Sequence, residues 1–148
     1  SLNIKYDPAF SAWSPKDAEL IAERDELVKT ITKELEELRY HLASDKIYQY
    51  TWSRFADVIL EESKAIFKNE SSDASEEQIS RAQFLLHTLR KILVIAHPFM
   101  PLVTEELWSI LNTGKSLSER VVDIDGATGA SRAKIEPAHL LMAEKWPN

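Results

Sequence analysis

Histidine is the side chain most often used to bind metal ions and to move protons near neutral pH, and this chain of 148 residues has four. They are His41, His87, His97 and His139. No two stand three or four residues apart, the spacing that would place both imidazoles on one face of a helix. His87 and His97 lie in an apolar stretch, where a histidine is usually packed and hydrogen-bonded. The spacing therefore predicts no metal site, and we expect His87 and His97 to be structural.

Carboxylates are the second group of side chains that would suit a metal ion. Glu34, Glu36 and Glu37 fall in one predicted helix, and Glu61 and Glu62 fall in the next. A di-metal site in a helical bundle also needs a Glu-x-x-His motif on each of two helices. Neither of these predicted helices contains one. We interpret the carboxylates as a solvated surface.

Two arginine–histidine pairs have the spacing of a nucleic-acid-cleaving site. Arg81 precedes His87 with five residues between them, and Arg90 precedes His97 with six. This pattern resembles the Arg-x(4 to 6)-His motif of the HEPN family of helical-bundle ribonucleases, which implies that the pair acts on the ribose hydroxyl and the phosphate of RNA. The polar residue that usually follows the family's arginine is Ala82 or Lys91 here. Metal-independent RNA cleavage therefore stays an alternative hypothesis.

The local charge of one stretch and the net charge of the whole chain indicate different binding partners. The stretch between Gln78 and Thr104 has no Asp or Glu but contains Arg81, Arg90, Lys91 and two histidines, which would form a local positive patch. The whole chain, however, has 18 Lys plus Arg against 24 Asp plus Glu, a net charge of −6. Nucleic-acid binding depends on local positive charge, and a domain this acidic would not bind strongly by charge alone. Charge thus also leaves open the hypothesis of a helical scaffold that contacts only proteins.

Composition excludes several other classes of site. The chain has no Cys, so it has no disulfide, no thiolate zinc site and no cysteine nucleophile. All 3 glycines follow residue 113, which excludes a glycine-rich phosphate loop in the preceding part. No stretch reaches the roughly 18 apolar residues of a membrane-spanning helix, and the first ten residues lack the pattern of a signal peptide. We expect a cytoplasmic domain that does not contact a membrane.

Start and stop signals divide the chain into four helical segments. Ser14-Pro15 is a helix start, a break falls near Arg39–His41, and Ser75 with Gln78 matches a capping box. His97-Pro98 ends the third segment, and a fourth, short segment ends near Gly114. We predict an all-α fold: an antiparallel helical bundle of about four helices over residues 15–113, within a single domain spanning 1–148. Residues 114–148 are expected to form a loop and a C-terminal irregular extension, with a short extended piece at 121–124.

Apolar residues recur at helical spacing in each segment and predict its buried face. In the first segment they are Leu20, Leu27, Ile31, Leu35, Leu38 and Leu42. In the second they are Tyr48, Trp52, Phe55, Ile59 and Ile66, and in the third Ile79, Ala82, Leu86, Leu89, Leu93 and Ala96. Among the large aromatic residues we expect core packing for Trp52, Phe55, Phe99 and Trp108.

Two separated motifs resemble one family. Residues 38–43 and 47–61 contain an Arg-Tyr-His turn, then an aromatic residue, Trp52, Phe55-Ala56-Asp57 and Leu60-Glu61. Residues 97–101 read His-Pro-Phe-Met-Pro, and residues 104–108 read Thr-Glu-Glu-Leu-Trp. In this order they resemble the anticodon-binding helical domain of class I aminoacyl-tRNA synthetases for branched aliphatic amino acids, most of all the valyl enzymes. Residues 141–147, with Met142 and Trp146-Pro147, are similar to the family's exit from the bundle.

The resemblance implies binding of the tRNA anticodon stem-loop, with aminoacylation performed by a catalytic domain absent here. It implies no catalytic residue, metal ligand or cofactor in this fragment, ATP and Mg²⁺ for the parent enzyme, and catalytic and editing domains of the parent chain as further partners. Unpaired anticodon bases can be bound by aromatic and arginine side chains, so the expected tRNA-binding residues are Arg39, Tyr40, His41, Lys46 and Arg54. Ala56 stands where valyl enzymes usually have cysteine, and Val58-Ile59 replaces an aromatic pair. A leucyl or isoleucyl parent therefore stays open.

Overall fold

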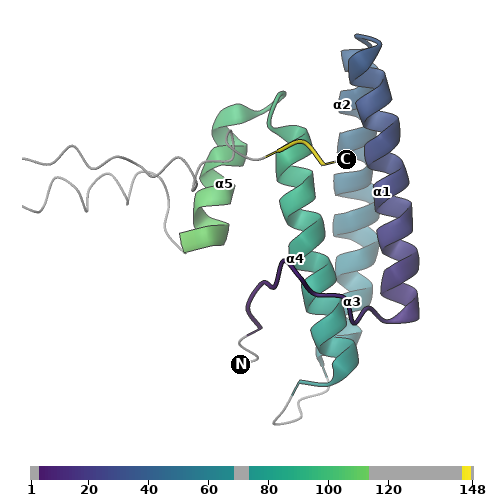
Figure 1. The fold of residues 1–148 in the computed structure, drawn as a ribbon, viewed down its shortest axis with the longest axis vertical. Helices are drawn as coiled ribbons and strands as arrows, with labels where there is room; N and C mark the ends of the chain where they lie inside the picture. The colour runs from purple at the N-terminus through teal and green to yellow at the C-terminus, as the bar shows by residue number, and fades with distance from the viewer. Residues whose placement is uncertain (1–3, 69–73, 114–144, 148) are drawn as a thin grey trace, which may run out of the picture. The chain divides into compact units, whose positions relative to one another are not determined.

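Helices make up the secondary structure that the computed structural model describes, over residues 4–68, 74–113 and 145–147 (Figure 1). They are α1 (Pro15–Glu36), α2 (Tyr40–Gln49), the π-helix η1 (Tyr50–Ile59), α3 (Leu60–Phe67), α4 (Glu76–Ala96) and α5 (Pro101–Thr113). α2, η1 and α3 follow one another without a loop and form one continuous helical stretch. The predicted all-α fold with about four helical segments is confirmed. The predicted loop, with Gly114 and the extended piece at 121–124, lies outside the described residues.

The starts of α1 and α4 follow the signals in the sequence. Ser14 caps α1, because its Oγ accepts a hydrogen bond from Asp17 N at 3.2 Å, and Pro15 takes the first helical position. Ser75 and Gln78 form the predicted capping box. Gln78 N donates to Ser75 Oγ at 3.2 Å, and Ser75 N donates to Gln78 Oε1 at 3.0 Å. Both starts therefore satisfy amide groups that have no partner within the helix.

The chain reverses between α1 and α2 in a three-residue turn, Glu37–Arg39, which overlaps the predicted break. Arg39 N donates to Glu34 O at 2.8 Å and Leu38 N donates to Leu35 O at 3.1 Å, the two bonds of a Schellman motif. Leu38 has a φ of 58°, a left-handed conformation that costs a non-glycine residue roughly 1–2 kcal/mol. The prediction that Leu38 belongs to a buried face is wrong. The turn aims its side chain away from the core, and 69% of it is exposed.

α1, the α2–η1–α3 stretch and the first part of α4 pack around one hydrophobic core, side by side in Figure 1. The buried residues of this core are Leu20, Tyr50, Phe55, Ile59, Phe84 and Ile92. They belong to the first of two compact units, which runs to Ile92, whereas the second runs from Leu93 to Pro147. The short turn after α1 makes it antiparallel to α2, as the bundle prediction requires.

The π-helix η1 changes which residues of the second helical segment are buried. Ile47, Tyr50, Phe55 and Ile59 are buried, with a step of five residues between Tyr50 and Phe55. That step matches the i→i+5 hydrogen bonding of a π-helix and not the three- or four-residue steps of an α-helix. The predicted α-helical stripe is therefore correct at Phe55 and Ile59 but wrong at Tyr48 and Trp52. Their side chains are 67% and 60% exposed.

The most buried positions of α4 are largely polar, which the apolar pattern did not predict. Gln78, Ser80, Arg81, Gln83 and Thr88 are all at most 3% exposed, while several of the predicted apolar positions are only partly buried. Each of these five side chains forms a hydrogen bond with another part of the chain, as buried polar groups require. The face of α4 inside the first unit is thus held by polar contacts as well as by its apolar residues.

Asp17 is the centre of this polar network. Its Oδ1 accepts from Arg81 Nε at 2.6 Å, and its Oδ2 accepts from Ser80 Oγ at 2.6 Å and from Ser14 Oγ at 2.9 Å. The side chains of Asp17 and Arg81 are each 1% exposed. Arg81 Nη1 also donates to Ser63 Oγ at 3.3 Å. One buried ion pair therefore joins the start of α1 to α4 and α3.

The segment before α1 lies along α4. The Gln83 side chain forms two hydrogen bonds with the backbone of this N-terminal segment. Asp7 N donates to Gln83 Oε1 at 3.0 Å, and Gln83 Nε2 donates to Lys5 O at 2.6 Å. The His87 ring lies 4.7 Å from the Tyr6 ring, centroid to centroid, and its Nε2 lies 2.8 Å from Asp7 O. The Arg90 guanidinium stacks over Tyr6 at 4.0 Å from the ring centroid. The N-terminal segment is thus fastened to the helix at successive turns.

The second unit contains the end of α4 and α5. α4 ends at Ala96, directly before His97-Pro98, as predicted. Leu93 and Trp108 form its buried cluster, and His97 Nδ1 lies 2.9 Å from Thr104 Oγ1. The motif of residues 97–108 therefore has a structural function: it fixes the start of α5 on the end of α4. Of the predicted core aromatics, Phe55 and Trp108 are buried and Phe99 is half-buried.

Candidate nucleic-acid interface

The turn between α1 and α2 presents three of the five predicted tRNA-binding residues. Arg39 precedes α2 and Tyr40 and His41 begin it. All three are exposed, Tyr40 to 54%. Leu38 adds an exposed apolar side chain directly before them. The turn thus offers a cation, an aromatic ring and an imidazole to solvent within three consecutive residues.

Glu34 joins two of the predicted cations. Its Oε2 accepts from Arg39 Nε at 2.6 Å, and its Oε1 accepts from Lys46 Nζ at 2.9 Å. Arg39 also forms an ion pair with Glu37. The hydrogen bond from Lys46, together with the charge and hydrogen bond of Arg39, lowers the pKa of Glu34, while desolvation opposes the shift. The carboxylate is therefore ionised at neutral pH and fixes both cations beside the turn, at the expense of part of their positive charge.

Arg54 stands apart from that group, on η1. It makes a two-bond contact with Glu23 of α1, from Nε to Oε1 and from Nη2 to Oε2, both at 2.7 Å. The hydrogen bond from Arg54 to Glu23 raises the pKa of the guanidinium. Lys46 and Arg54 each form an ion pair with a carboxylate of α1. The structure gives each its own carboxylate and does not bring them into one cluster.

Tyr48 and Trp52 form an exposed aromatic pair that the sequence pattern assigned to the core. Their ring centroids are 6.5 Å apart and their planes differ by 2°, which is a stacked arrangement. Their spacing of four residues gave a signal for mutual contact on one helix face. Their exposure follows from the five-residue step between the buried Tyr50 and Phe55, and the three- and four-residue spacing expected of an amphipathic α-helix does not contain such a step.

The positive patch predicted on the third helical segment does not form. Arg81 is buried against Asp17, Arg90 covers the Tyr6 ring, and Lys91 Nζ donates to Asp25 Oδ1 at 2.7 Å. Burial lowers the pKa of His87, against the opposing hydrogen bond to Asp7 O, so its ring is neutral at pH 7. The ribonuclease hypothesis is disfavoured for the Arg81–His87 pair, because the Arg81 guanidinium is 1% exposed and cannot reach a phosphate.

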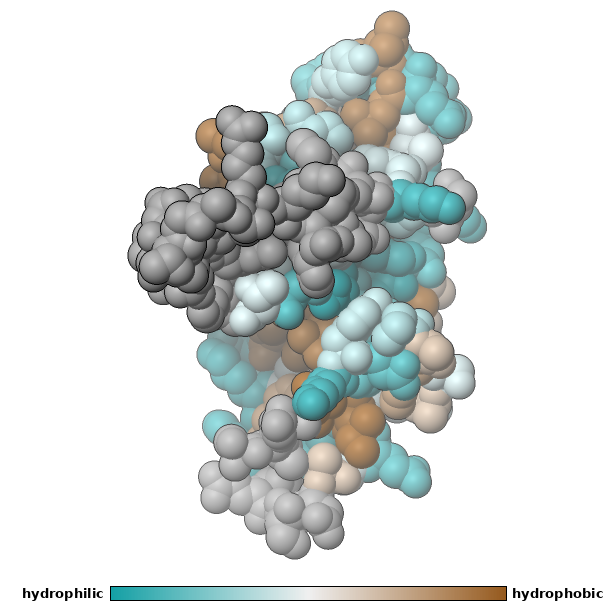
Figure 2. All heavy atoms as spheres, turned by 60° about the vertical axis from the view of Figure 1, so that its left-hand side comes forward, coloured by the Kyte–Doolittle hydropathy of each residue, from teal (hydrophilic) through white to brown (hydrophobic). Residues whose placement is uncertain are grey.

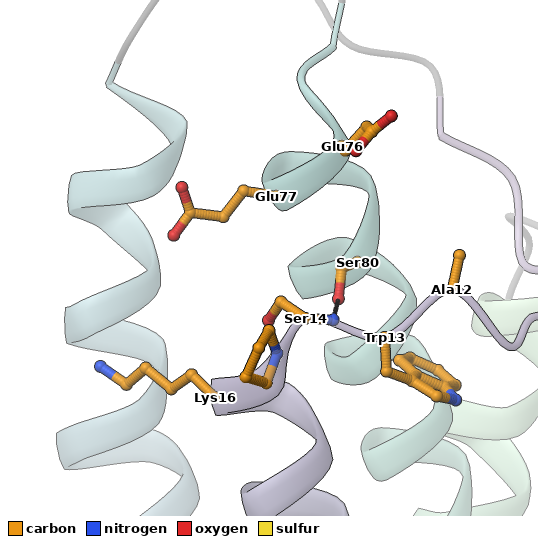
Figure 3. A pocket seen from close by; sticks show the side chains of 8 residues that line it. Ala12, Trp13, Ser14, Lys16, Glu76, Glu77 and Ser80 are labelled. Carbon is orange, nitrogen blue, oxygen red and sulfur yellow. Dashed lines mark hydrogen bonds between the residues drawn. The ribbon is translucent and has the colours of Figure 1, made fainter.

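An open pocket of about 580 Å³ lies at the starts of α1 and α4 (Figure 3). Its lining residues are Ala12, Trp13, Ser14, Pro15, Lys16, Glu76, Glu77 and Ser80. Ser14 N donates to Ser80 Oγ at 2.8 Å across it, and Lys16 Nζ pairs with Glu62 at 2.9 Å. Because two carboxylates line it and its cation is already paired, the pocket does not suit a phosphate. Among the residues described, no group of three His, Asp or Glu side chains is placed to hold a metal ion, and none of the described helices is long and apolar enough to cross a membrane.

Comparison with protein families decides the classification. The family described as the anticodon-binding domain of tRNA ligase matches residues 17–148. The chain belongs to this family. The match begins two residues inside α1 and includes every residue of the turn, the Glu34 pairs and the Tyr48–Trp52 pair.

Three relatives of this anticodon-binding domain are all valine–tRNA ligases. The chain is 34% identical to the valine–tRNA ligase of Agrobacterium fabrum over 109 residues, 72% of the chain and 11% of the relative. It is 36% identical to that of Aquifex aeolicus over 121 residues, 75% of the chain and 10% of the relative. It is 37% identical to that of Pelagibacter ubique over 99 residues, 65% of the chain and 11% of the relative. The chain therefore spans about a tenth of the length of the relatives it matches.

Proposed function

We propose that this anticodon-binding domain binds the anticodon stem-loop of a valine tRNA and so positions that tRNA for a valine–tRNA ligase. The observation that carries the proposal is the family match over residues 17–148, supported by three valine–tRNA ligases at 34–37% identity. Charging would take place in the cytoplasm, on a catalytic domain of the parent chain, and the catalytic and editing domains of that chain would be further partners. ATP and Mg²⁺ would bind to that catalytic domain and not here.

The turn at Glu37–Arg39 and the following residues are the proposed tRNA contact. Arg39 offers a planar guanidinium for a phosphate or a base edge, and Tyr40 and His41 offer faces on which an unpaired base stacks. Lys46 pairs with the same Glu34 carboxylate as Arg39, so the two cations lie beside one another. Arg54 would contribute at a separate place, since Glu23 holds it away from this group.

The proposal is tested by titrating the 148-residue chain with stem-loops of valine, leucine and isoleucine tRNAs at low salt. Each stem-loop carries its own or an exchanged anticodon, and a gel follows both binding and cleavage. Binding of the intact valine stem-loop, lost when the anticodon is exchanged, supports the proposal. Cleavage would revive the ribonuclease reading, preference for another anticodon would change the amino acid, and no binding at low salt would refute RNA recognition by this domain.

Salt dependence separates the proposed phosphate contacts from structural ion pairs. Each phosphate contact contributes about −0.7 to −0.9 to the slope of log affinity against log salt. Arg39→Gln and Lys46→Gln should each flatten the slope by about this amount, whereas Lys29→Gln, which removes an exposed lysine paired with Glu26, should leave it unchanged. Glu34→Gln should steepen the slope, because it frees the charge of both cations.

A further inference from the structure

The π-helix exposes a tryptophan, Trp52, that a regular α-helix of this sequence would bury. With α-helical spacing, Trp52 would continue the apolar stripe of Phe55 and Ile59. The i→i+5 turn instead places Tyr50 and Phe55 in the core and leaves Tyr48 and Trp52 in solvent. π-helical turns are rare and occur frequently at functional sites. An exposed tryptophan created by such a turn is therefore a candidate contact residue.

The surroundings of the aromatic pair limit what can bind to it. His41, Asp45, Gln49 and Ser53 are exposed near it along α2 and η1, so the two rings form a small apolar surface within a polar helix face. Figure 2 shows one face of the molecule, on which hydrophilic and hydrophobic side chains of the described residues are interspersed. A stable protein interface needs about 800 Å² from each partner with a continuous apolar centre. Two isolated rings match the size of one or two nucleobases much better.

We infer that Tyr48 and Trp52 form a stacking surface for an unpaired nucleobase of the RNA that this domain binds. Their planes are parallel to within 2°, so a base that stacks on one ring is also parallel to the other. Stacking on aromatic rings requires an unpaired base and tolerates any sequence. Asp45 lies between His41 and Tyr48 on the helix and would repel a phosphate, so the contact is with a base and not with the backbone.

This inference rests on the proposed function and extends it by two residues that were not among the expected tRNA contacts. Tyr48 follows His41 by seven residues, two helical turns along the same face of α2. A single-stranded loop that contacts the turn at its start would therefore continue onto the rings. The turn supplies the charged contacts and the aromatic pair supplies stacking.

The test measures binding of a fluorescent anticodon stem-loop, with 2-aminopurine at one loop position after another, to the 148-residue chain. Trp52→Leu and Tyr48→Leu should each weaken binding about 5- to 150-fold, the range for one stacked base, and should abolish the quenching of 2-aminopurine at one loop position. Trp52→Phe and Tyr48→Phe keep a ring and should retain most of both. Leu102→Ala, which removes an exposed apolar side chain on α5, is the control and should change neither. A duplex of the stem without its loop should bind equally to all variants.

The outcomes distinguish this inference from the proposed function. Anticodon-dependent binding that is unchanged in Trp52→Leu and Tyr48→Leu would overturn the inference while the proposed function stands. Absence of binding by the unmodified chain at low salt would overturn both. Self-association that disappears in Trp52→Leu, with RNA binding unaffected, would assign the rings to a second copy of the chain and would also overturn it. Circular dichroism of each variant shows that the helices are intact.

Discussion

Loss of the Asp17 carboxylate should destabilise the domain more than loss of any exposed carboxylate. Asp17→Ala removes the acceptor of three hydrogen bonds and leaves Arg81 charged, buried and without its ion-pair partner. Breaking a buried pair in this way costs about 3–5 kcal/mol. In a chain of this length each kcal/mol lowers Tm by about 2–4 °C, so the expected decrease is about 6–20 °C.

Thermal and urea unfolding followed by circular dichroism would measure this loss. Glu19→Gln, at an exposed carboxylate of the same helix, is the control and should stay within about 0.5 kcal/mol. Ser63→Ala, which removes the contact to Arg81 and the hydrogen bond from Ser63 Oγ to Ile59 O but leaves the ion pair in place, should cost about 1 kcal/mol. It keeps the series interpretable if Asp17→Ala does not fold.

A double-mutant cycle isolates the ion pair itself. Asp17→Asn and Arg81→Gln, singly and together, should show a coupling free energy of about 2–3 kcal/mol, because each single variant leaves one charge buried and the double variant leaves none. A coupling near zero, or a cost below about 1 kcal/mol for Asp17→Ala, would show that the pair does not hold α1 to α4 as the hydrogen bonds indicate.

Three further predictions concern single positions. Leu38→Gly should stabilise the domain by up to about 1 kcal/mol, because glycine adopts the left-handed turn without strain; an unchanged urea midpoint would contradict this. Tyr50→Phe should be neutral or stabilising by about 1 kcal/mol in thermal unfolding, since the buried Tyr50 hydroxyl has no hydrogen-bond partner in the described part of the chain and burial raises its pKa to about 12. His87 has a folded-state pKa below its usual 6.5, so its contribution is present at pH 7 and lost as the pH falls; Tm should decrease from pH 7.5 to 5, and less so in His87→Gln.

Local signals predicted the helix ends and long apolar stripes predicted the fold class, because both depend on a few neighbouring residues. Ser14, Ser75 with Gln78, and His97-Pro98 act within one turn of helix, and all were placed correctly. Leu38 was placed wrongly because its left-handed turn depends on two backbone bonds to α1 and not on a glycine. Trp52 was placed wrongly because the π-helix buries Tyr50 and Phe55, five residues apart, a step that α-helical periodicity does not contain.

The sequence predicted which types of residue form the candidate site, but it did not predict which ion pairs they form. Arg39 and Lys46 are seven residues apart, and nothing in that spacing indicated that one carboxylate of the preceding helix would hold both. The charge pattern between Gln78 and Thr104 predicted a positive patch, but the anions that neutralise it, Asp17 and Asp25, come from a distant part of the sequence. Ion pairs across helices therefore have to be read from the structure.

The N-terminal segment along α4 bears on how this domain should be excised for experiment. The family match begins at residue 17, so a fragment cut there would lack Ser14 and Pro15, which start α1. It would also lack Tyr6, leaving the Arg90 guanidinium and one side of the His87 ring newly exposed on α4. Such a fragment should begin at or before residue 4, because a boundary drawn from family similarity alone removes residues that complete the folded surface of α4.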